Sequence, residues 1–400
     1  MRRTAALLRA LALTVICGLA LPVTAQQARP VIVGVALPQT GMLSDLGAGM
    51  RDALLLWQEQ VNARGGLAGR RVELRIHDDA SEAVRARNLY ELLIKDDQAD
   101  ILVGPFGSAA SSMAAAVADR ARRVMVNASG TSPAIHKRAY RWVFQVPPPS
   151  DAYAVGLLPL ALRAGARSLS IVASEEPAGT AMRDALKTAA EKQGLALSEV
   201  RVFEQGNVVD LAAFAAELRK AGTEVLLSPA SLPETGNLLR GLRAAGFMPR
   251  IFATRAITDP GLIASVGVDA EHTMGFSSWE PNARTVGNPE FVSAYRTRYK
   301  RAPDFHAACG WAAGTLIEAA VARAGGLDQA ALRIALSTMD ADTVLGPYKV
   351  DADGAQVGAQ SLIVQIQKGR REVVWPDALA SAAPVLPAPG WNARALPGRK

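Results

Sequence analysis

Short apolar runs alternate with longer amphipathic segments along most of the chain. The run Val31–Leu37 is almost continuously apolar, which is typical of a strand in a parallel sheet covered on both faces. After it, Met50, Trp57 and Val61 recur at the spacing of one helix face. The alternation continues with strands expected at 72–76, 101–103 and 124–126 and helices at 81–95 and 108–122. This order predicts a doubly wound α/β unit with right-handed crossovers.

The pattern stops at a proline run and then starts again. Pro147, Pro148 and Pro149 cannot continue a helix or a central strand. The second series has strands expected at 169–173, 197–203, 225–227 and 251–254 and helices at 151–164, 180–193, 211–221, 234–245, 289–300 and 306–324. Because open α/β sheets bind ligands beyond the carboxyl ends of their strands, two such lobes predict a ligand cleft between them.

The first 25 residues have the features of a secretory signal peptide. Arg2, Arg3 and Arg9 precede a charge-free, mostly apolar stretch at 10–21, and small residues lead up to Ala25. The apolar stretch is shorter than the roughly 20 residues that span a bilayer. We therefore predict export to the periplasm with cleavage after Ala25.

Composition places the mature chain among ordinary globular proteins. The 400 residues are 50% hydrophobic and 20% charged, which excludes a disordered acidic chain or a collagen-like repeat. The formal net charge is +7, but the three arginines of the signal peptide leave only +4 for the rest. A surplus this small, spread among acidic residues, argues against nucleic-acid binding.

Motifs for catalysis or metal binding are missing from the sequence. The four histidines show no metal-ligand spacing, and there is neither a phosphate-binding GK[ST] nor a G-x-S-x-G motif. Asp78 and Asp79 form a carboxylate pair, which we interpret as capping the next helix. Cys309, the single cysteine beyond the signal peptide, is expected to be a buried structural thiol. We therefore expect no enzyme, no cofactor and no metal site.

Two predicted strand-to-helix loops carry small hydroxyl residues. Ser108 follows a Gly-Pro-Phe-Gly turn at the start of a helix, and the next strand leads into Ser129 and Thr131. A serine and the free backbone amides of a helix N-terminus can bind an anion. Neighbouring parallel strands place their loops side by side, so the two loops form either a carboxylate cradle or two ordinary helix caps.

Six short segments, in this order and at these intervals, resemble the periplasmic branched-chain amino-acid-binding proteins. These are type I solute receptors of ABC importers and include leucine/isoleucine/valine-binding proteins. The segments are IVGVALPQTG at 32–41, VNARGGLAGRR at 61–71, HDD at 77–79, VGP at 103–105, SGTSP at 129–133 and YKRAPD at 299–304. The resemblance extends over roughly residues 30 to 370.

The resemblance implies the type I periplasmic binding protein fold, an α/β architecture of two doubly wound parallel-sheet lobes. Three segments, near 146–149, 276–280 and 346–349, are expected to cross between lobes that close by hinge motion. The expected parts are lobe 1 at 30–147 plus 279–347, lobe 2 at 148–278 plus 348–378, and a flexible tail at 379–400.

The resemblance also implies a ligand site, of which this sequence keeps one half. Residues matching Ser108, Ser129 and Thr131 hold the carboxylate of an amino acid in the family, the last two partly through backbone groups. The other half departs from the family pattern. Aromatic residues of the family are replaced by Leu46, Ala178 and Ser231, and Arg255 stands where the family has the acid that pairs with the ammonium group.

Arg255 changes the expected ligand. It either faces the cleft and pairs with a second anionic or carbonyl group, or it points to solvent or into an ion pair between the lobes. Either way, the sequence favours a small carboxylate without a free ammonium, such as an aromatic, keto or dicarboxylic acid. Phe276, Trp279 and Phe305 either form apolar walls near the cleft or belong to the core.

The function that follows is solute binding for import. We expect a monomeric periplasmic receptor that binds a small-molecule solute and delivers it to an ABC transporter permease in the inner membrane. The alternative is a periplasmic sensor that passes ligand occupancy to a signalling partner.

Overall fold

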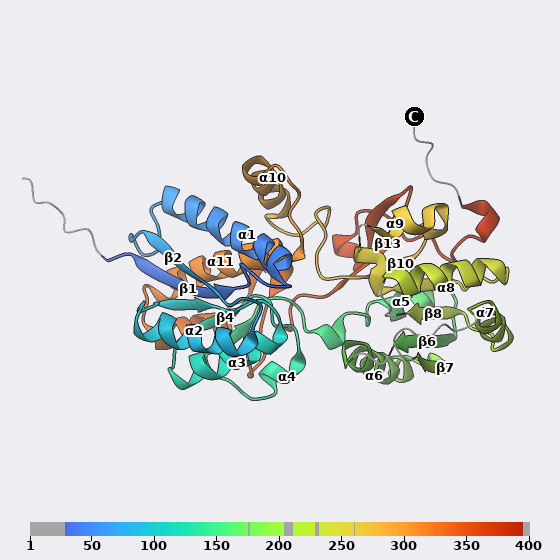
Figure 1. Ribbon diagram of the computed structural model, residues 1–400, viewed down its shortest axis with the longest axis horizontal. Helices are drawn as coiled ribbons and strands as arrows, with labels where there is room; N and C mark the ends of the chain where they lie inside the picture. The colour runs from blue at the N-terminus through green and yellow to red at the C-terminus, as the bar shows by residue number, and fades with distance from the viewer. Residues whose placement is uncertain (1–28, 175–176, 204–210, 229–231, 260, 395–400) are drawn as a thin grey trace, which may run out of the picture.

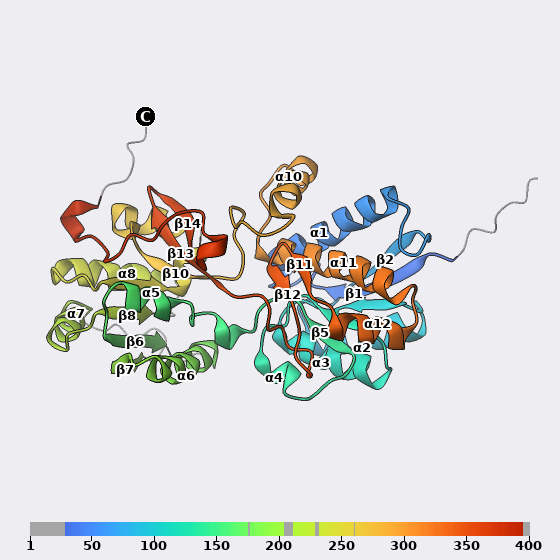
Figure 2. The same cartoon turned by 180° about the vertical axis from the view of Figure 1, so that it is seen from behind.

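The protein consists of two α/β lobes that lie side by side (Figure 1). The computed structural model describes residues 29–174, 177–203, 211–228, 232–259 and 261–394, so the proposed signal peptide lies outside the described residues. Three chain segments run between the lobes, seen from behind in Figure 2. Within the described ranges, no helix has the length and apolar character needed to cross a membrane.

Lobe 1 contains a five-stranded parallel sheet in the order β2-β1-β3-β4-β5. Its strands are β1 Val31–Leu37, β2 Val72–Asp78, β3 Ile101–Val103, β4 Met125–Asn127 and β5 Val143–Gln145. Its helices are α1 Ser44–Ala63, α2 Ala83–Lys95, α3 Ser108–Arg120, α4 Pro133–His136, α10 Asn288–Tyr299, α11 Phe305–Ala324 and α12 Gln329–Thr338. A hairpin of β11 Ala341–Thr343 and β12 Gly346–Tyr348 completes the lobe.

The apolar run of β1 is buried on both faces, as its composition predicts. Val31, Val33 and Val35 pack with α1 and α11, whereas Ile32 and Ala36 pack with α2 and α3 on the other face (Figure 1). Burying both faces fixes the pairing of β1 in the middle of the sheet, because a shift by one residue would exchange the two sets.

Two glycines of α11 allow it to pack closely on α1. A Cβ atom on Gly314 would lie 2.4 Å from Cγ of Trp57, and one on Gly310 would lie 2.8 Å from the carbonyl oxygen of Met50. Both separations are shorter than carbon atoms tolerate, so only glycine fits there. Cys309, next to Gly310, is fully buried, and burial raises the pKa of its thiol, as expected for a structural cysteine.

Lobe 2 contains a seven-stranded sheet in the order β14-β13-β10-β9-β8-β6-β7. Its strands are β6 Ser168–Ser174, β7 Ala196–Phe203, β8 Val225–Ser228, β9 Ile251–Thr254, β10 Met274–Ser277, β13 Leu362–Gln367 and β14 Arg370–Trp375. Its helices are α5 Leu157–Arg163, α6 Pro177–Lys192, α7 Leu211–Lys220, α8 Leu232–Ala244 and α9 Gly261–Val266. The 3-10 turns are η1 Ser150–Ala152, η2 Arg255–Thr258, η3 Gly267–Ala270, η4 Asp377–Leu379 and η5 Trp391–Ala393. The sheet is parallel except for β13 and β14, which extend it in antiparallel fashion.

The third crossing comes later in the chain than the expected 346–349. Residues Gly346–Tyr348 form β12 of the lobe 1 hairpin, where Tyr348 is buried and donates a hydrogen bond to the carbonyl oxygen of Leu336. Gln356 is still bound to lobe 1, because its side-chain amide donates to the carbonyl oxygen of Val146 at 3.1 Å. The chain therefore crosses between Gln356 and β13, and residues 348–356 pack with lobe 1 and not with lobe 2.

The C-terminal segment packs on lobe 2 as far as the structure describes it. The indole of Trp391 donates to the carbonyl oxygen of Phe247 at 3.0 Å, and the guanidinium of Arg394 donates to that of Asp269 at 2.6 Å. Arg394 is 7% exposed and lies over the ring of Trp391. The prediction of a flexible tail is therefore wrong for residues 379–394, since the polar ends of these side chains bind backbone groups that composition does not reveal.

Candidate solute-binding site

The carboxyl ends of both sheets border the junction between the lobes. The first crossing, at 146–149, leaves the carboxyl end of β5, and the second leaves the carboxyl end of β10. In lobe 1 the chain order reverses between β1 and β3, and in lobe 2 between β6 and β8. Ligands of open α/β sheets bind at such points. All seven sequence-predicted site residues follow the carboxyl end of a strand.

Ser108 and Ser129 lie on two loops that bind one another. The hydroxyl of Ser129 accepts a hydrogen bond from the amide of Gly107 at 3.0 Å, and that of Ser108 accepts one from the amide of Ser132 at 3.2 Å. A hydroxyl that accepts still has its own proton to donate. Neither hydroxyl donates to another group among the described residues, so both protons remain available for an anion.

The buried side-chain amide of Asn127 fixes the conformation of the Ser129 loop. Asn127 is fully buried, and its side chain both accepts from the amide of Gly130 and donates to its carbonyl oxygen, each at 2.9 Å. Gln145 donates to the same carbonyl oxygen at 3.3 Å. A Cβ atom on Gly130 would lie 2.5 Å from Cβ of Ser111, so this position also requires glycine. These contacts from within lobe 1 fix the conformation of the loop that carries Ser129.

Thr131 connects this loop to the crossings. Its carbonyl oxygen accepts from the amide of Ser150 at 2.9 Å, just after the first crossing. Burial raises the pKa of the Tyr153 hydroxyl to about 12, opposed by its interactions with the side chains of Ser278 and Thr131. Ser278 belongs to the second crossing, so one tyrosine joins a predicted site residue to that crossing.

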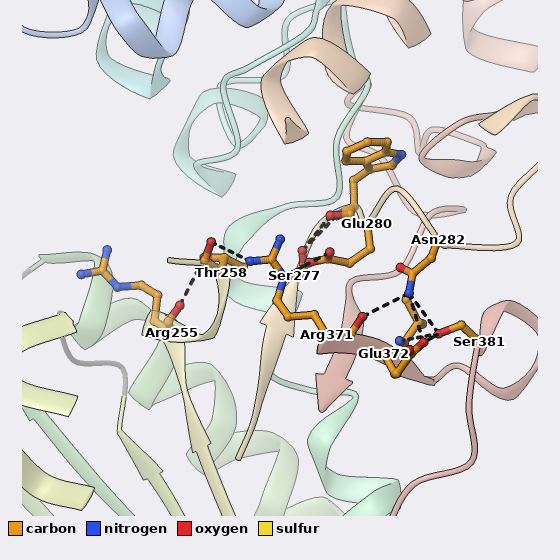
Figure 3. A network of polar contacts seen from close by, with 10 residues as sticks. Arg255, Thr258, Ser277, Glu280, Asn282, Arg371, Glu372 and Ser381 are labelled. Carbon is orange, nitrogen blue, oxygen red and sulfur yellow. Dashed lines mark hydrogen bonds and ion pairs between the residues drawn. The ribbon is translucent and has the colours of Figure 1, made fainter. Parts of the chain in front are cut away.

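The remaining predicted site residues are spread over both lobes. Leu46 is 45% exposed in the first turn of α1, and Ala178 lies in the first turn of α6. Arg255 is exposed at the start of η2, directly after β9, and its guanidinium extends away from the nearby Glu280–Arg371 pair (Figure 3). Ser231 lies outside the described residues. The structure thus brings the three carboxylate-cradle residues together, and it places Leu46 in lobe 1 and Ala178 and Arg255 in lobe 2.

An ion pair that sequence analysis missed lies at the second crossing (Figure 3). Glu280 is 3% exposed, and its carboxylate lies 3.2 Å from Nε of Arg371 on β14. Arg371 also donates to the carbonyl oxygen of Thr258 at 3.1 Å. Burial raises the pKa of Glu280, while Arg371 and Ser277 lower it. No local signal could reveal this pair, because its members are 91 residues apart in the chain.

The structure also decides the alternatives left open for other side chains. Trp279 and Phe276 are almost fully buried in the cores, and Phe305 packs against the lobe 1 core. Asp78 and Asp79 close the turn before α2 but do not cap it, since the residue that precedes the helix is Glu82. Among the described residues no group of His, Cys, Asp or Glu could hold a metal ion.

Two α/β lobes joined by three crossings, with the carboxyl ends of both sheets at the junction, form the architecture of a two-lobed solute-binding protein. A family model described as periplasmic binding protein matches residues 30–371, and the chain belongs to this family. Family members are solute-binding receptors that work with ABC transporter permeases, and the family location is the periplasm.

Three known proteins illustrate the similarity. Leu/Ile/Val-binding protein homolog 7 of Brucella suis is 24% identical over 375 residues, which cover 89% of this chain and 94% of that protein. An ABC transporter substrate-binding protein from Desulfitobacterium hafniense in complex with Leu has a TM-score of 0.73 and 22% identity, covering 86% of this chain and 99% of that one. A solute-binding protein from R. palustris in complex with benzoate has a TM-score of 0.67 and 21% identity, covering 90% and 99%.

Proposed function

We propose that this protein binds a small organic acid without a free ammonium group and delivers it to an ABC permease. The observation that carries the proposal is Arg255, which directly follows β9 where the resembled family has an acid. Ser108 and Ser129 supply two hydroxyl protons for one carboxylate, and Arg255 supplies a cation for a second anionic or carbonyl group.

Electrostatics supports this choice of ligand. A cation about 4 Å from a ligand ammonium costs roughly 4 kcal/mol at an effective dielectric constant of about 20. That cost corresponds to about a thousandfold in affinity. An organic acid avoids it and gains attraction from the same side chain. The structural neighbour in complex with benzoate is an example of the fold with an aromatic acid.

The remaining parts of the proposal concern the whole molecule. The mature chain begins after Ala25, acts as a monomer in the periplasm, and binds its solute without converting it. Closure of the two lobes around the three crossings buries the solute and presents the closed form to the permease.

Isothermal titration calorimetry of the purified mature protein tests the ligand class. We expect benzoate or another small carboxylate to bind and leucine to give no heat. The variant Arg255→Glu should weaken binding of the carboxylate at least tenfold, because it replaces attraction by repulsion. Tight leucine binding together with no heat from organic acids contradicts the proposal.

Arg219→Glu is the matched control for Arg255→Glu. Arg219 is an exposed arginine in the last turn of α7, which precedes β8 and therefore ends at the amino edge of the same sheet. The control makes the same change in net charge away from the proposed site. If it weakens carboxylate binding as much as Arg255→Glu does, Arg255 acts only through the overall charge.

A further inference from the structure

A small cavity adjoins Ser108 on the lobe 1 side of the junction. Its volume is about 150 Å³. Three apolar side chains, Pro38, Leu43 and Phe106, line it together with the start of α3. Two acidic residues also line it, the buried Asp79 and the exposed Glu82. The cavity thus combines apolar walls with a single buried acid beside the proposed carboxylate cradle.

The two members of the Asp78–Asp79 pair differ in how their oxygens are satisfied. Burial acts to raise the pKa of Asp78, but bonds from the Thr40 hydroxyl and from the amides of Ala80, Gln39 and Thr40 outweigh it and lower the pKa to about 2. Both oxygens of Asp78 are therefore bound.

Asp79 is less exposed but has a spare oxygen. The side chain is 2% exposed, and Oδ1 accepts from the amide of Ser81 at 2.9 Å. Within the described part of the chain, Oδ2 receives no hydrogen bond. Burial raises the pKa of Asp79, and the charge of Asp78 adds to the increase, while the bond from Ser81 opposes it. A buried carboxylate with an empty acceptor position is stabilised by a donor that enters the cavity.

The chemistry of the cavity limits what can enter. A second carboxylate of the ligand would be repelled by Asp79. A hydroxyl on an apolar frame would pack against Phe106, Leu43 and Pro38 and donate to Oδ2. The volume suits an aromatic ring, since a cavity of about 150 Å³ can hold benzene.

We propose that this cavity is a subsite for the ring of a hydroxyl-substituted aromatic acid, whose hydroxyl donates a hydrogen bond to Asp79. The inference rests on the proposed function, because the ligand carboxylate is placed at Ser108 and Ser129. The inference adds Asp79 to the site, as a residue that favours aromatic acids with a hydroxyl donor over those without one. Asp79 is thus a specificity-determining residue in lobe 1, whereas Arg255 belongs to lobe 2.

Calorimetry with a matched ligand series tests the subsite on the wild-type protein. The series consists of benzoate, its three monohydroxy isomers and the three corresponding methoxy compounds. We expect at least one hydroxy isomer to bind at least tenfold more tightly than benzoate. Its methoxy counterpart can accept but not donate, so it should lose this advantage. Equal binding of benzoate and all three hydroxy isomers overturns the subsite.

The variant Asp79→Asn tests the residue. Asparagine keeps an oxygen that accepts from Ser81 but offers an amide donor where Oδ2 accepted. The ratio of hydroxybenzoate to benzoate affinity should fall at least tenfold, because the variant no longer accepts the hydrogen bond from the ligand hydroxyl. An unchanged ratio overturns the assignment of Asp79.

Glu82→Gln is the control, because Glu82 lines the same cavity and is exposed. It removes one negative charge and should leave the affinity ratio unchanged. If it lowers the ratio as much as Asp79→Asn, the effect is one of charge and not of a hydrogen bond.

The subsite alone is contradicted if benzoate binds and a hydroxyl group on the ring does not increase the affinity. The proposed function itself fails when no organic acid binds and leucine does.

Discussion

Trp279 and Glu280 are adjacent in the chain but bind opposite lobes. The indole of Trp279 donates to Oδ1 of Asn288 at 2.8 Å, at the start of α10 in lobe 1. The carboxylate of Glu280 pairs with Arg371 on β14 of lobe 2. The second crossing is therefore anchored to both lobes within two residues, so we expect a hinge motion between the lobes to bend the chain close to this point.

Removing Arg371 should destabilise lobe 2. The variant Arg371→Ala leaves the buried carboxylate of Glu280 without its cation, which typically costs about 3 kcal/mol. Urea unfolding measures this loss. The double variant Glu280→Gln/Arg371→Ala removes the unpaired charge and should regain more than half of it. A single variant as stable as the wild type would show that the pair contributes nothing.

The pH dependence of stability should report on His136. Burial lowers its pKa below the ordinary value of about 6.5, although the charges of Asp351 and Asp353 oppose the shift. Because the folded protein then binds the proton less readily than the unfolded chain, this stability is complete above pH 6.5 and is lost as the pH falls through the lowered pKa. Wild-type protein should lose more stability than His136→Gln between pH 7.5 and 5, measured by urea unfolding. Equal losses contradict the prediction.

His136 is also linked to the proposed site through the side chain of Asn127. Its Nδ1 lies 3.1 Å from the carbonyl oxygen of Asp353, and its Nε2 lies 3.5 Å from Nδ2 of Asn127, which fixes Gly130. When the imidazole ring is protonated, its Nε2–H group faces the Nδ2–H group of Asn127, and two donors repel one another. Carboxylate affinity at pH 5 should therefore fall further in the wild type than in the glutamine variant.

Ser129→Ala should affect both stability and binding. The substitution removes the acceptor for the Gly107 amide, which costs about 1 kcal/mol in unfolding free energy. It also removes a donor for the ligand carboxylate, so affinity should fall about tenfold or more. Ser112→Ala, one turn into α3, is the control and should change neither. A loss of stability without any loss of affinity would leave Ser129 a purely structural residue.

Truncation after residue 378 should weaken lobe 2. It deletes Trp391 and Arg394, whose polar ends bind Phe247 and Asp269. We expect a loss of about 3 kcal/mol, the scale of a large buried side chain. Truncation after Arg394 is the control and should retain wild-type stability in urea unfolding. An unchanged midpoint in the shorter protein would show that the segment packs without stabilising the lobe.

The alternation of strands and helices could be predicted from sequence because it depends on local apolar patterns. The strands Val31–Leu37 and Ile251–Thr254 are confirmed with the predicted bounds. The three-residue strand β5 was missed because the proline run follows it directly. The third crossing was misplaced because Tyr348 and Gln356 are held in lobe 1 by partners distant in sequence.

Some residues of the candidate site could also be predicted from the sequence, and others could not. Ser108, Ser129 and Thr131 could be found because glycine-rich turns and hydroxyl residues follow predicted strands. The Glu280–Arg371 pair could not be found, because β14 was not predicted and the pairing spans 91 residues. The place of Asp79 beside a cavity could not be predicted, because it depends on several loops that meet in space, which no single segment of the sequence encodes.

The side chain of Gln356 connects the first and the third crossing. Its side-chain oxygen accepts from the amides of Lys349, Gly358 and Ala359, and its amide group donates to the carbonyl oxygen of Val146 in the first crossing. Hydrogen bonds of Gln356 thus connect the first and third crossings at their lobe 1 ends. When the lobes close on a solute, we expect the first and third crossings to move together and the second crossing to act as a separate connection.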